Sequence, residues 1–555
     1  MIGEFDSTCG RTPIDTLIVG SGPAGVTLAL ELARRGAPCT LLESGADGVS
    51  AAQQLSDAEI VDPRLHDDMS VAVARRFGGA SNLWGGRAVP LDPIDFAPRP
   101  FCGDARWPIS YDDIAPWYET ACRYAHCGAP VFEAPLDAPA RASAAFSMVE
   151  IERASNKPKF QKAHRAALAA APLIDVRLRA TVVDLDFAEN GRVAAALVVG
   201  PDGARRRLPA RRIVLAAGGL ETTRLLLIAR RGRPDAFGGP DGPLGRYYMG
   251  HLIGEIADVV FADGRYDRAL DFIKDGAGSY VRRRFTPSAA EQTRHDLPNI
   301  CFWPVVPPIA DPRHGSGALS AVALALSTPV LRTALIPQAI RARHLGAAID
   351  WAPHLRNVVV DAPRTAAFLA QFVHRRYLAA QRIPGYFVRN DAHRYGLSYH
   401  SEQSPRAESR VTLSERGDAL GTPRLRVDMR VHDDDARAVA RAHERLAAWI
   451  AGAGVGRVEY RQPAAETAAA VMAKAGHGTH QIGTTRMGAT RREGVVDGDL
   501  ACFDAPNLYV ASSSAFPTSG QANPTLSIVA FAARLAERLT RDDGRLALTR
   551  ASAHG

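Results

Sequence analysis

The fold of this chain is decided by residues 14–25, Ile-Asp-Thr-Leu-Ile-Val-Gly-Ser-Gly-Pro-Ala-Gly. Residues 14–19 are typical of a short buried strand, and the apolar residues after Gly25 recur at helical spacing until Gly36. Residues 39–43 form a second expected strand, which ends in Glu43, 18 residues after Gly25. Strand, glycine turn, helix, strand and acidic end together are the fingerprint of a dinucleotide-binding, Rossmann-like unit.

The residues of this unit have separate expected roles. Gly20 permits the tight turn, Gly22 lets the backbone approach a pyrophosphate, and Gly25 lets the helix pack closely on the strand. The start of the helix offers unpaired N–H groups and a positive dipole end to phosphate. Glu43 can accept hydrogen bonds from ribose hydroxyls. The unit predicts a bound dinucleotide, and by itself it fits FAD and NAD equally.

Two distant segments continue the same pattern. Residues 211–219 are an apolar strand that runs into paired glycines, and a helix is predicted over 220–228. Residues 507–513 form another buried-strand pattern, and an amphipathic helix follows, with Pro524 suited to its first turn. The nucleotide domain is therefore expected to be built from both ends and the middle of the chain. The intervening segments must form a second domain.

The composition excludes several other classes of protein. Of the 555 residues, 46% are hydrophobic and 23% charged, as is ordinary for a globular protein and unlike a disordered or fibrous one. The apolar stretch 318–331 is too short and too interrupted to span a membrane, and residues 1–12 lack the apolar region of a signal peptide. The net charge is +8, but the basic residues are scattered, so no nucleic-acid partner is expected. Seven dispersed cysteines without a CxxC pair suggest neither disulfides nor zinc, and a reducing cytoplasm is the expected location.

Three more motifs accompany the fingerprint: Gly-Gly-Ala-Ser-Asn-Leu-Trp-Gly-Gly at 78–86, His-Gln-Ile-Gly-Thr-Thr-Arg-Met-Gly at 480–488, and Asn-Pro-Thr at 523–525. With them the chain resembles the glucose–methanol–choline (GMC) flavoprotein oxidoreductases, most closely the pyranose oxidase-like and bacterial sugar or polyol dehydrogenase branch. The resemblance implies an α/β fold, in which a Rossmann-like FAD-binding domain is interleaved with a substrate domain built on an antiparallel sheet with helices.

On this resemblance the FAD-binding domain takes residues 13–95, 180–255 and 475–542. Residues 96–179 connect the domains, and residues 256–474 form the substrate domain. Its stretch at about 319–387 is largely helical in pattern and is interpreted as an addition: a lid, an oligomer contact or a surface docking element.

The resemblance implies that His480 and Asn523 face the reactive edge of the flavin. Alcohol oxidation removes a hydroxyl proton, and a histidine of ordinary pKa is well suited to accept it near neutral pH. The Asn523 amide can donate to the developing alkoxide oxygen. The structural alternative is a core histidine and a helix N-cap.

The expected FAD contacts are made by Gly20, Gly22, Gly25, Glu43, Gly79, Ser81, Asn82, Trp84, Val183, Ala217, Ser513, Asn523, Pro524 and Thr525. In relatives with covalently attached flavin a histidine stands in the loop that corresponds to residues 78–86. No histidine stands there in this chain, which implies noncovalent FAD.

Other polar residues could also take part. His477 and His480 form an HxxH pair, but no third ligand stands at useful spacing, so no metal site is expected. Glu402 is expected to pair with Arg406 or Arg410. Candidates for contacts with a polar substrate in the middle of the chain are Asn299, His314, His400 and Glu402.

The resulting hypothesis is an FAD-dependent oxidation of a hydroxyl group of a sugar, glycoside or polyol to a carbonyl. His480 would take the proton and flavin N5 the hydride, with oxygen, a quinone or another compound as the electron acceptor. The alternatives are a natural-product tailoring oxidase acting on an aglycone or aminoglycoside, and a lyase or binding protein that uses flavin without redox chemistry. The sequence does not predict the oligomeric state.

Overall fold

The fingerprint strand, residues 14–19, is paired on both sides within a nine-stranded sheet. The computed structural model describes residues 1–6, 9–10, 12–103, 105–136, 145–328 and 350–552. The parallel part of the sheet is formed by β1 (Ile2–Glu4), β8 (Ile174–Leu178), β3 (Cys39–Glu43), β2 (Ile14–Val19), β11 (Arg205–Leu215) and β22 (Ala505–Val510). Antiparallel strands complete it: β10 (Val193–Val199), β9 (Thr181–Phe187) and β21 (Ala501–Cys502).

Helices cover this sheet because its strands are apolar on both faces, as in other parallel sheets. Leu17 and Ile18 of β2 are fully buried. Helix α1 (Pro23–Arg34) packs against the long C-terminal helix α15 (Thr525–Ser552), and α15 also packs against α3 (Trp117–Ala125). Helices α5 (Gly219–Arg231) and α4 (Phe160–Ala170) complete this half of the molecule. The two ends and the middle of the chain thus meet in one domain.

A second half is built on antiparallel sheets, as the resemblance implied. One sheet has the order β16 (Ile300–Val305), β17 (Arg394–Glu402), β12 (His251–Phe261) and β20 (Gly456–Tyr460), with α13 (Asp433–Gly452) and α14 (Thr467–Met472) packed on it. The other has the order β13 (Ile273–Lys274), β14 (Tyr280–Arg283), β7 (Ile151–Ala154) and β5 (Arg87–Ala88). Shorter elements are α2 (Met69–Ala72), α6 (Gly264–Ala269), α7 (Ala289–His295), β6 (Phe146–Ser147) and β15 (Thr286–Pro287).

Some segments pack outside the domain in which the sequence places them. Strand β8 lies before residue 180 but belongs to the nine-stranded sheet, and β12 begins at His251, before residue 256. Strand β19 (Pro423–Asp428) pairs with β18 (Arg410–Gly417) on one side and with β4 (Ala58–Ile60) on the other, and Val411 and Val427 of this sheet join the apolar core of the nine-stranded sheet. The reason is that buried apolar faces, and not sequence order, decide which core a strand joins.

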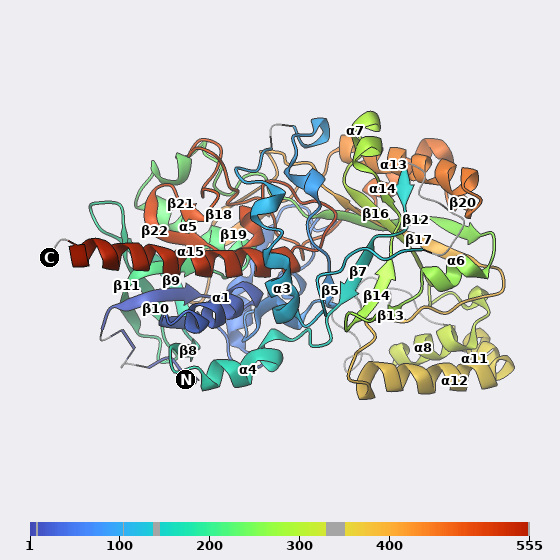
Figure 1. Cartoon of the computed structure of the whole chain (residues 1–555), viewed down its shortest axis with the longest axis horizontal. Helices are drawn as coiled ribbons and strands as arrows, with labels where there is room; N and C mark the ends of the chain where they lie inside the picture. The colour runs from blue at the N-terminus through green and yellow to red at the C-terminus, as the bar shows by residue number, and fades with distance from the viewer. Residues whose placement is uncertain (7–8, 11, 104, 137–144, 329–349, 553–555) are drawn as a thin grey trace.

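The helical addition lies at one corner of the second half of the molecule (Figure 1). Its described helices are α8 (Gly317–Ser327), α11 (Trp351–Val360) and α12 (Ala362–Val373), followed by one π-helical turn at His374–Leu378. Residues 329–349 of the expected stretch 319–387 lie outside the described residues. Among the helices that the structure describes, none is long and apolar enough to cross a membrane.

Candidate active site

A cavity of about 440 Å³ is lined by residues of both halves of the molecule. The ends of β2 and β3, the start of α1, the loop at 78–86 and the start of α15 supply one part of its wall. Strands β12, β16 and β17 supply another part through Ile253, Trp303 and His400. The cavity therefore lies where the glycine fingerprint meets the antiparallel sheet.

The fingerprint glycines form a cradle with space in front of it. At Gly20 φ is +105°, and a Cβ there would lie 2.6 Å from the carbonyl oxygen of Ala216. A Cβ at Gly25 would lie 1.9 Å from the oxygen of Gly20, so only glycine allows this close approach of helix and strand. Gly22 differs, since its φ is an ordinary −68° and no atom of the described part of the chain lies within 4 Å of the position that a Cβ would take. A pyrophosphate can approach the backbone in that open space.

The donors around Gly22 suit a phosphate and a ribose. Helix α1 begins at Pro23 without a side-chain cap, which leaves its first N–H groups and its positive dipole end for a ligand. The Glu43 carboxylate accepts hydrogen bonds from Ser21 Oγ at 2.6 Å and from Gly45 N at 2.8 Å. These contacts hold it at the cavity wall, where its remaining lone pairs can accept from ribose hydroxyls. The residues present therefore fit a dinucleotide cofactor.

The loop at 78–86 packs directly on this cradle. A Cβ at Gly79 would lie 2.9 Å from Cα of Gly22, so the loop crosses the fingerprint turn at close range. Ser81 Oγ donates to the carbonyl of Gly78 at 2.6 Å, and Trp84 Nε1 donates to the carbonyl of Pro158 at 2.6 Å. These bonds fix the loop while Ser81 and Trp84 line the cavity.

Most of the expected cofactor residues line the cavity, but three do not. Gly25 lies inside the contact between α1 and β2. The Asn82 amide donates to the carbonyls of Phe77 and Gly79, and so shapes the loop. Successive strand residues point to opposite faces, and in β9 it is Val182, not Val183, that lines the cavity. The expected residues in the wall are Gly20, Gly22, Glu43, Gly79, Ser81, Trp84, Ala217, His480, Ser513, Asn523, Pro524 and Thr525.

His480 and Asn523 lie side by side in the cavity wall. The Asn523 Nδ2 group donates to Nε2 of His480 at 3.0 Å. Asn523 precedes Thr525, the first residue of α15, so the helix start fixes its position. The structure therefore brings together the two residues that the motifs single out, although 43 positions separate them.

The imidazole rings of two further histidines lie next to this pair. His251 and His400 lie on the neighbouring strands β12 and β17, and their rings stack with centroids 4.3 Å apart. Burial lowers the pKa of His251 to about 3, with a smaller contribution from the Arg87 charge. Burial also lowers the pKa of His400 well below its usual value, and its Nδ1–H donates to the carbonyl of Gln521 at 2.6 Å. Both rings are therefore neutral at physiological pH.

The sequence spacing of His477 and His480 predicted no metal site, but it did not reveal that His251 lies beside them. Its ring, with those of His477 and His480, forms the one group of three possible metal ligands among the described residues, with ligand atoms within 4.8 Å of one another. Three imidazoles could hold a divalent cation such as zinc. Nδ1 of His480 lies 2.8 Å from Nδ1 of His251, whereas Nε2 is the nitrogen that contacts Asn523.

Arg87 is a cavity residue that the sequence analysis missed. Its guanidinium donates to the Asn523 side-chain oxygen and to Glu152, and it lies over the Trp303 ring, 4.9 Å from the centroid. Arg282, also bound to Glu152, lies 4.7 Å from the same centroid. The available signal was the position of Arg87 directly after Gly85-Gly86, at the end of the flavin-loop motif.

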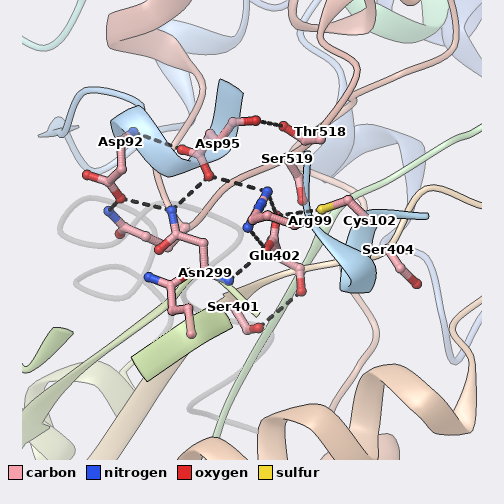
Figure 2. Close-up of polar contacts among 12 residues, drawn as sticks. Asp92, Asp95, Arg99, Cys102, Asn299, Ser401, Glu402, Ser404, Thr518 and Ser519 are labelled. Atoms are coloured by element: carbon pink, nitrogen blue, oxygen red, sulfur yellow. Dashed lines mark hydrogen bonds and ion pairs between the residues drawn. The ribbon is translucent and has the colours of Figure 1, made fainter. Parts of the chain in front are cut away.

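Glu402 pairs with Arg99, and the expected pairing with Arg406 or Arg410 is wrong (Figure 2). Arg99 Nη2 donates to Glu402 Oε2 at 2.9 Å, and the backbone N–H of Asn299 donates to Glu402 Oε1 at 2.6 Å. The Asn299 amide in turn donates to Asp95 and Asp92, and burial raises the pKa of Asp95 to about 7. Of the four candidates in the middle of the chain, only His400 lines the cavity; His314 packs near His354 on α11.

Comparison with known proteins identifies the two domains. The FAD binding domain matches residues 13–64, and the GMC oxidoreductase family matches residues 405–532. The chain is 23% identical to 2-methyl-1,2-propanediol dehydrogenase of Mycolicibacterium austroafricanum, over 96% of each protein. It is 23% identical to paromamine 6'-oxidase of Streptomyces fradiae, over 95% of this chain and 91% of that one. Among solved structures, pyridoxine 4-oxidase from Mesorbium loti shares the fold with a TM-score of 0.54 and 19% identity, over 95% of this chain and 99% of that one.

The Rossmann-like sheet, the open cradle at Gly22 and the matched FAD binding domain place the chain among the flavin-dependent oxidoreductases. More particularly, residues 405–532 are a GMC oxidoreductase domain, which confirms the family that the sequence motifs suggested, and the chain is an enzyme.

Proposed function

We propose that this enzyme oxidises a hydroxyl group of a sugar, glycoside or polyol to a carbonyl, with His480 as the base and Asn523 as the donor to the hydroxyl oxygen. The observation that carries the proposal is the contact between His480 Nε2 and Asn523 Nδ2 in the cavity wall. A substrate hydroxyl that reaches both groups can donate its proton to Nε2 and accept a hydrogen bond from Nδ2–H.

The proton moves from the hydroxyl oxygen to His480 Nε2, and the resulting alkoxide oxygen is stabilised by the Asn523 amide. The Arg87 guanidinium, bound to the other side of the same amide, adds positive charge near that oxygen. When bound, FAD supplies the acceptor for the hydride that leaves the carbinol carbon. Substrate loses one proton and one hydride, and a carbonyl compound remains.

We infer that FAD is held without a covalent bond. The loop at 78–86 contains no histidine, and its cavity-lining side chains, Ser81, Leu83 and Trp84, are not groups that attach flavin in this family's covalent members. Acid precipitation of the holoenzyme should release the yellow colour into the supernatant. Colour that stays with the precipitated protein would contradict this inference.

A polyhydroxylated substrate fits the substrate side of the cavity. Trp303 offers an aromatic face, while His400 and Thr479 are polar groups in the same wall. The His400 Nε2 atom is buried and has no hydrogen-bond partner among the described residues, so it can accept a bond from a second substrate hydroxyl. The related 2-methyl-1,2-propanediol dehydrogenase and paromamine 6'-oxidase are named for substrates that carry several hydroxyl groups.

An amino sugar is the second candidate, because one relative is named for paromamine. The cavity charge argues against it. Arg87 lines the wall, and no carboxylate other than Glu43 and Glu221 is found in the described lining. A cationic amine beside the Arg87 guanidinium would be repelled. A neutral polyol avoids this repulsion, so we favour neutral substrates.

The test is anaerobic reduction of the bound flavin by a panel of alcohols. A hexose, a glycoside or a cyclic polyol should bleach the flavin far faster than methanol, choline or a hydrophobic alcohol, because the site's buried polar groups need hydroxyl partners. Bleaching by the hydrophobic alcohol alone would refute the carbohydrate assignment. A flavin that no alcohol reduces would instead support the non-redox alternative.

A further inference from the structure

The outer surfaces of α11 and α12 carry an apolar stripe that faces solvent. Trp351, Leu355 and Val359 recur every four residues along α11 and are exposed. Leu369, Val373 and Tyr377 continue the same spacing along α12 and the turn after it, and they are exposed as well. Residues four apart lie on one face of a helix, so each helix presents a continuous apolar ridge to solvent. We call this surface the hairpin ridge; Val360 and Leu378 also belong to it.

The two helices attach to the protein through their opposite faces. His354 of α11 is buried, and its Nδ1 lies 2.9 Å from Ser320 Oγ on α8. Thr365 of α12 is buried beside Gly317, and Phe372 packs toward the cluster of Ala154, Tyr280 and Ile383. The inner faces of both helices are therefore buried against the protein, whereas the side chains of the hairpin ridge do not contribute to its core. The most exposed of its side chains, Val359, Val360 and Leu378, are 74%, 77% and 72% accessible.

An excess of positive charge accompanies the ridge. Residues 351–390 contain six arginines and one acidic residue, Asp361. Arg356, Arg364 and Arg375 are exposed, and none of them forms an ion pair with a described residue. Exposed arginines elsewhere, such as Arg64 and Arg265, are paired with carboxylates. This corner of the molecule thus combines exposed apolar side chains with cations that form no ion pair among the described residues.

We propose that the hairpin ridge docks on the surface of a lipid bilayer that contains anionic headgroups. Helices that lie in the plane of a membrane interface have this composition: Trp, Leu and other apolar side chains on one face and arginine beside it. The apolar side chains would enter the headgroup region, and Arg356, Arg364 and Arg375 would meet the lipid charges. A second copy of this chain fits less well, because a two-fold contact through the ridge would set arginines against arginines.

Vesicle binding by the intact holoenzyme tests the proposal. The protein should sediment with phosphatidylcholine vesicles that contain phosphatidylglycerol, and at least about tenfold less with pure phosphatidylcholine. Val359→Gln/Leu378→Gln should weaken binding at least about tenfold, since it removes two exposed apolar side chains that the bilayer would bury. The matched control is Val49→Gln/Val131→Gln, two exposed valines outside the ridge, which should bind like wild type.

A second pair of variants tests how much the arginine charges contribute to vesicle binding. Arg356→Gln/Arg364→Gln should weaken binding to the anionic vesicles, whereas Arg64→Gln/Arg416→Gln, which removes the same charge elsewhere, should not. Unchanged flavin content shows in each case that the fold is intact. Absence of vesicle binding, equal loss in the ridge and control variants, or a dimer in solution that the ridge variants abolish would each overturn the proposal.

Discussion

Nδ1 of His480 lies 2.8 Å from Nδ1 of His251, across 229 residues of sequence. Since Nε2 of His480 accepts a hydrogen bond from Asn523, the proton of the neutral ring is on Nδ1, and His251 accepts it. Burial holds the pKa of His251 at about 3, so His251 remains an acceptor throughout the neutral pH range. This contact fixes the tautomer in which His480 presents a basic Nε2 to the cavity.

Replacing His480 removes the proposed base. His480→Ala should retain FAD but slow reduction of the flavin by substrate by about 10²–10⁴, the usual contribution of a positioned base. Stopped-flow anaerobic mixing measures this rate, and His314→Ala, which alters a histidine outside the cavity wall, is the control. Wild-type reduction should slow on acidification, because only the neutral imidazole accepts a proton. An unchanged rate in His480→Ala would remove this residue from the mechanism.

Replacing His251 tests positioning. His251→Leu should slow reduction about tenfold or more, because His480 loses the acceptor that holds its tautomer. His251→Asn keeps an acceptor oxygen near the position of Nδ1 and should recover part of the rate. The pH dependence of reduction should shift in His251→Leu and return in His251→Asn. A purely structural role would lower both variants' stability without moving the pH profile.

Asn523 is expected to act through its N–H group. Asn523→Ala should slow reduction by about 10²–10³, the loss expected for one donor to a developing oxyanion. Asn523→Asp keeps an oxygen for Arg87 but has no N–H, so it should be slowed as much. If Asn523→Asp reduced flavin at the wild-type rate, the contact with Arg87, and not the donor, would be what matters.

Gly22 and Gly48 form a matched pair for the cofactor cradle. Neither has a positive φ, and no atom of the residues that the structure describes lies within 4 Å of a Cβ at either position. Gly22→Val should therefore fold but purify without FAD, because the side chain fills the space that the pyrophosphate needs. Gly48→Val should purify yellow. The absorbance spectra of both purified variants show whether FAD is bound. A Gly22→Val variant that is fully yellow would exclude the cradle as the pyrophosphate site.

A second buried histidine, His443, should make the protein less stable as the pH falls. His443 is fully buried, neither of its ring nitrogens has a hydrogen-bond partner among the described residues, and burial lowers its pKa to about 3. Between that value and about 6.5 the unfolded chain binds a proton that the native state does not, so the free energy of unfolding decreases as pH falls. His443→Leu should remove about 2 kcal/mol of the loss between about pH 7.5 and 5. Urea unfolding at the two pH values measures it; His374→Leu, at an exposed position, should leave the pH dependence unchanged.

Local sequence predicted the nucleotide half of the fold well because its determinants are contiguous. The glycines at 20, 22 and 25 act on backbone within a few residues, and the run 14–19, bounded by a glycine turn, is a short strand whose last four residues are buried. The pairing of β2 with β3, and the start of α15 after Pro524, follow from such short-range rules.

The surroundings of the candidate site were less predictable because they depend on register between distant strands. His251 reaches His480 because β12 pairs with β17 so that His251 lies opposite Glu402 and Ile253 opposite His400. A shift of one residue would turn these side chains to the other face. Glu402 pairs with Arg99, which lies in a loop 303 residues earlier in the chain, and not with a neighbour in sequence. Val182 and Val183 show how a single position of register decides which side chain lines a cavity.

The sequence by itself determined the nucleotide cradle, the family resemblance and the two residues proposed to act on the substrate, His480 and Asn523. Short sequence motifs identify them, because each motif depends only on residues that are close together in the chain. Tertiary structure alone decided what surrounds them: His251 as the acceptor for His480, Arg87 on Asn523, and His400 in the substrate wall. These contacts arise from long-range strand pairing and burial, which depend on the packing of the whole chain and leave no periodic trace in any one segment.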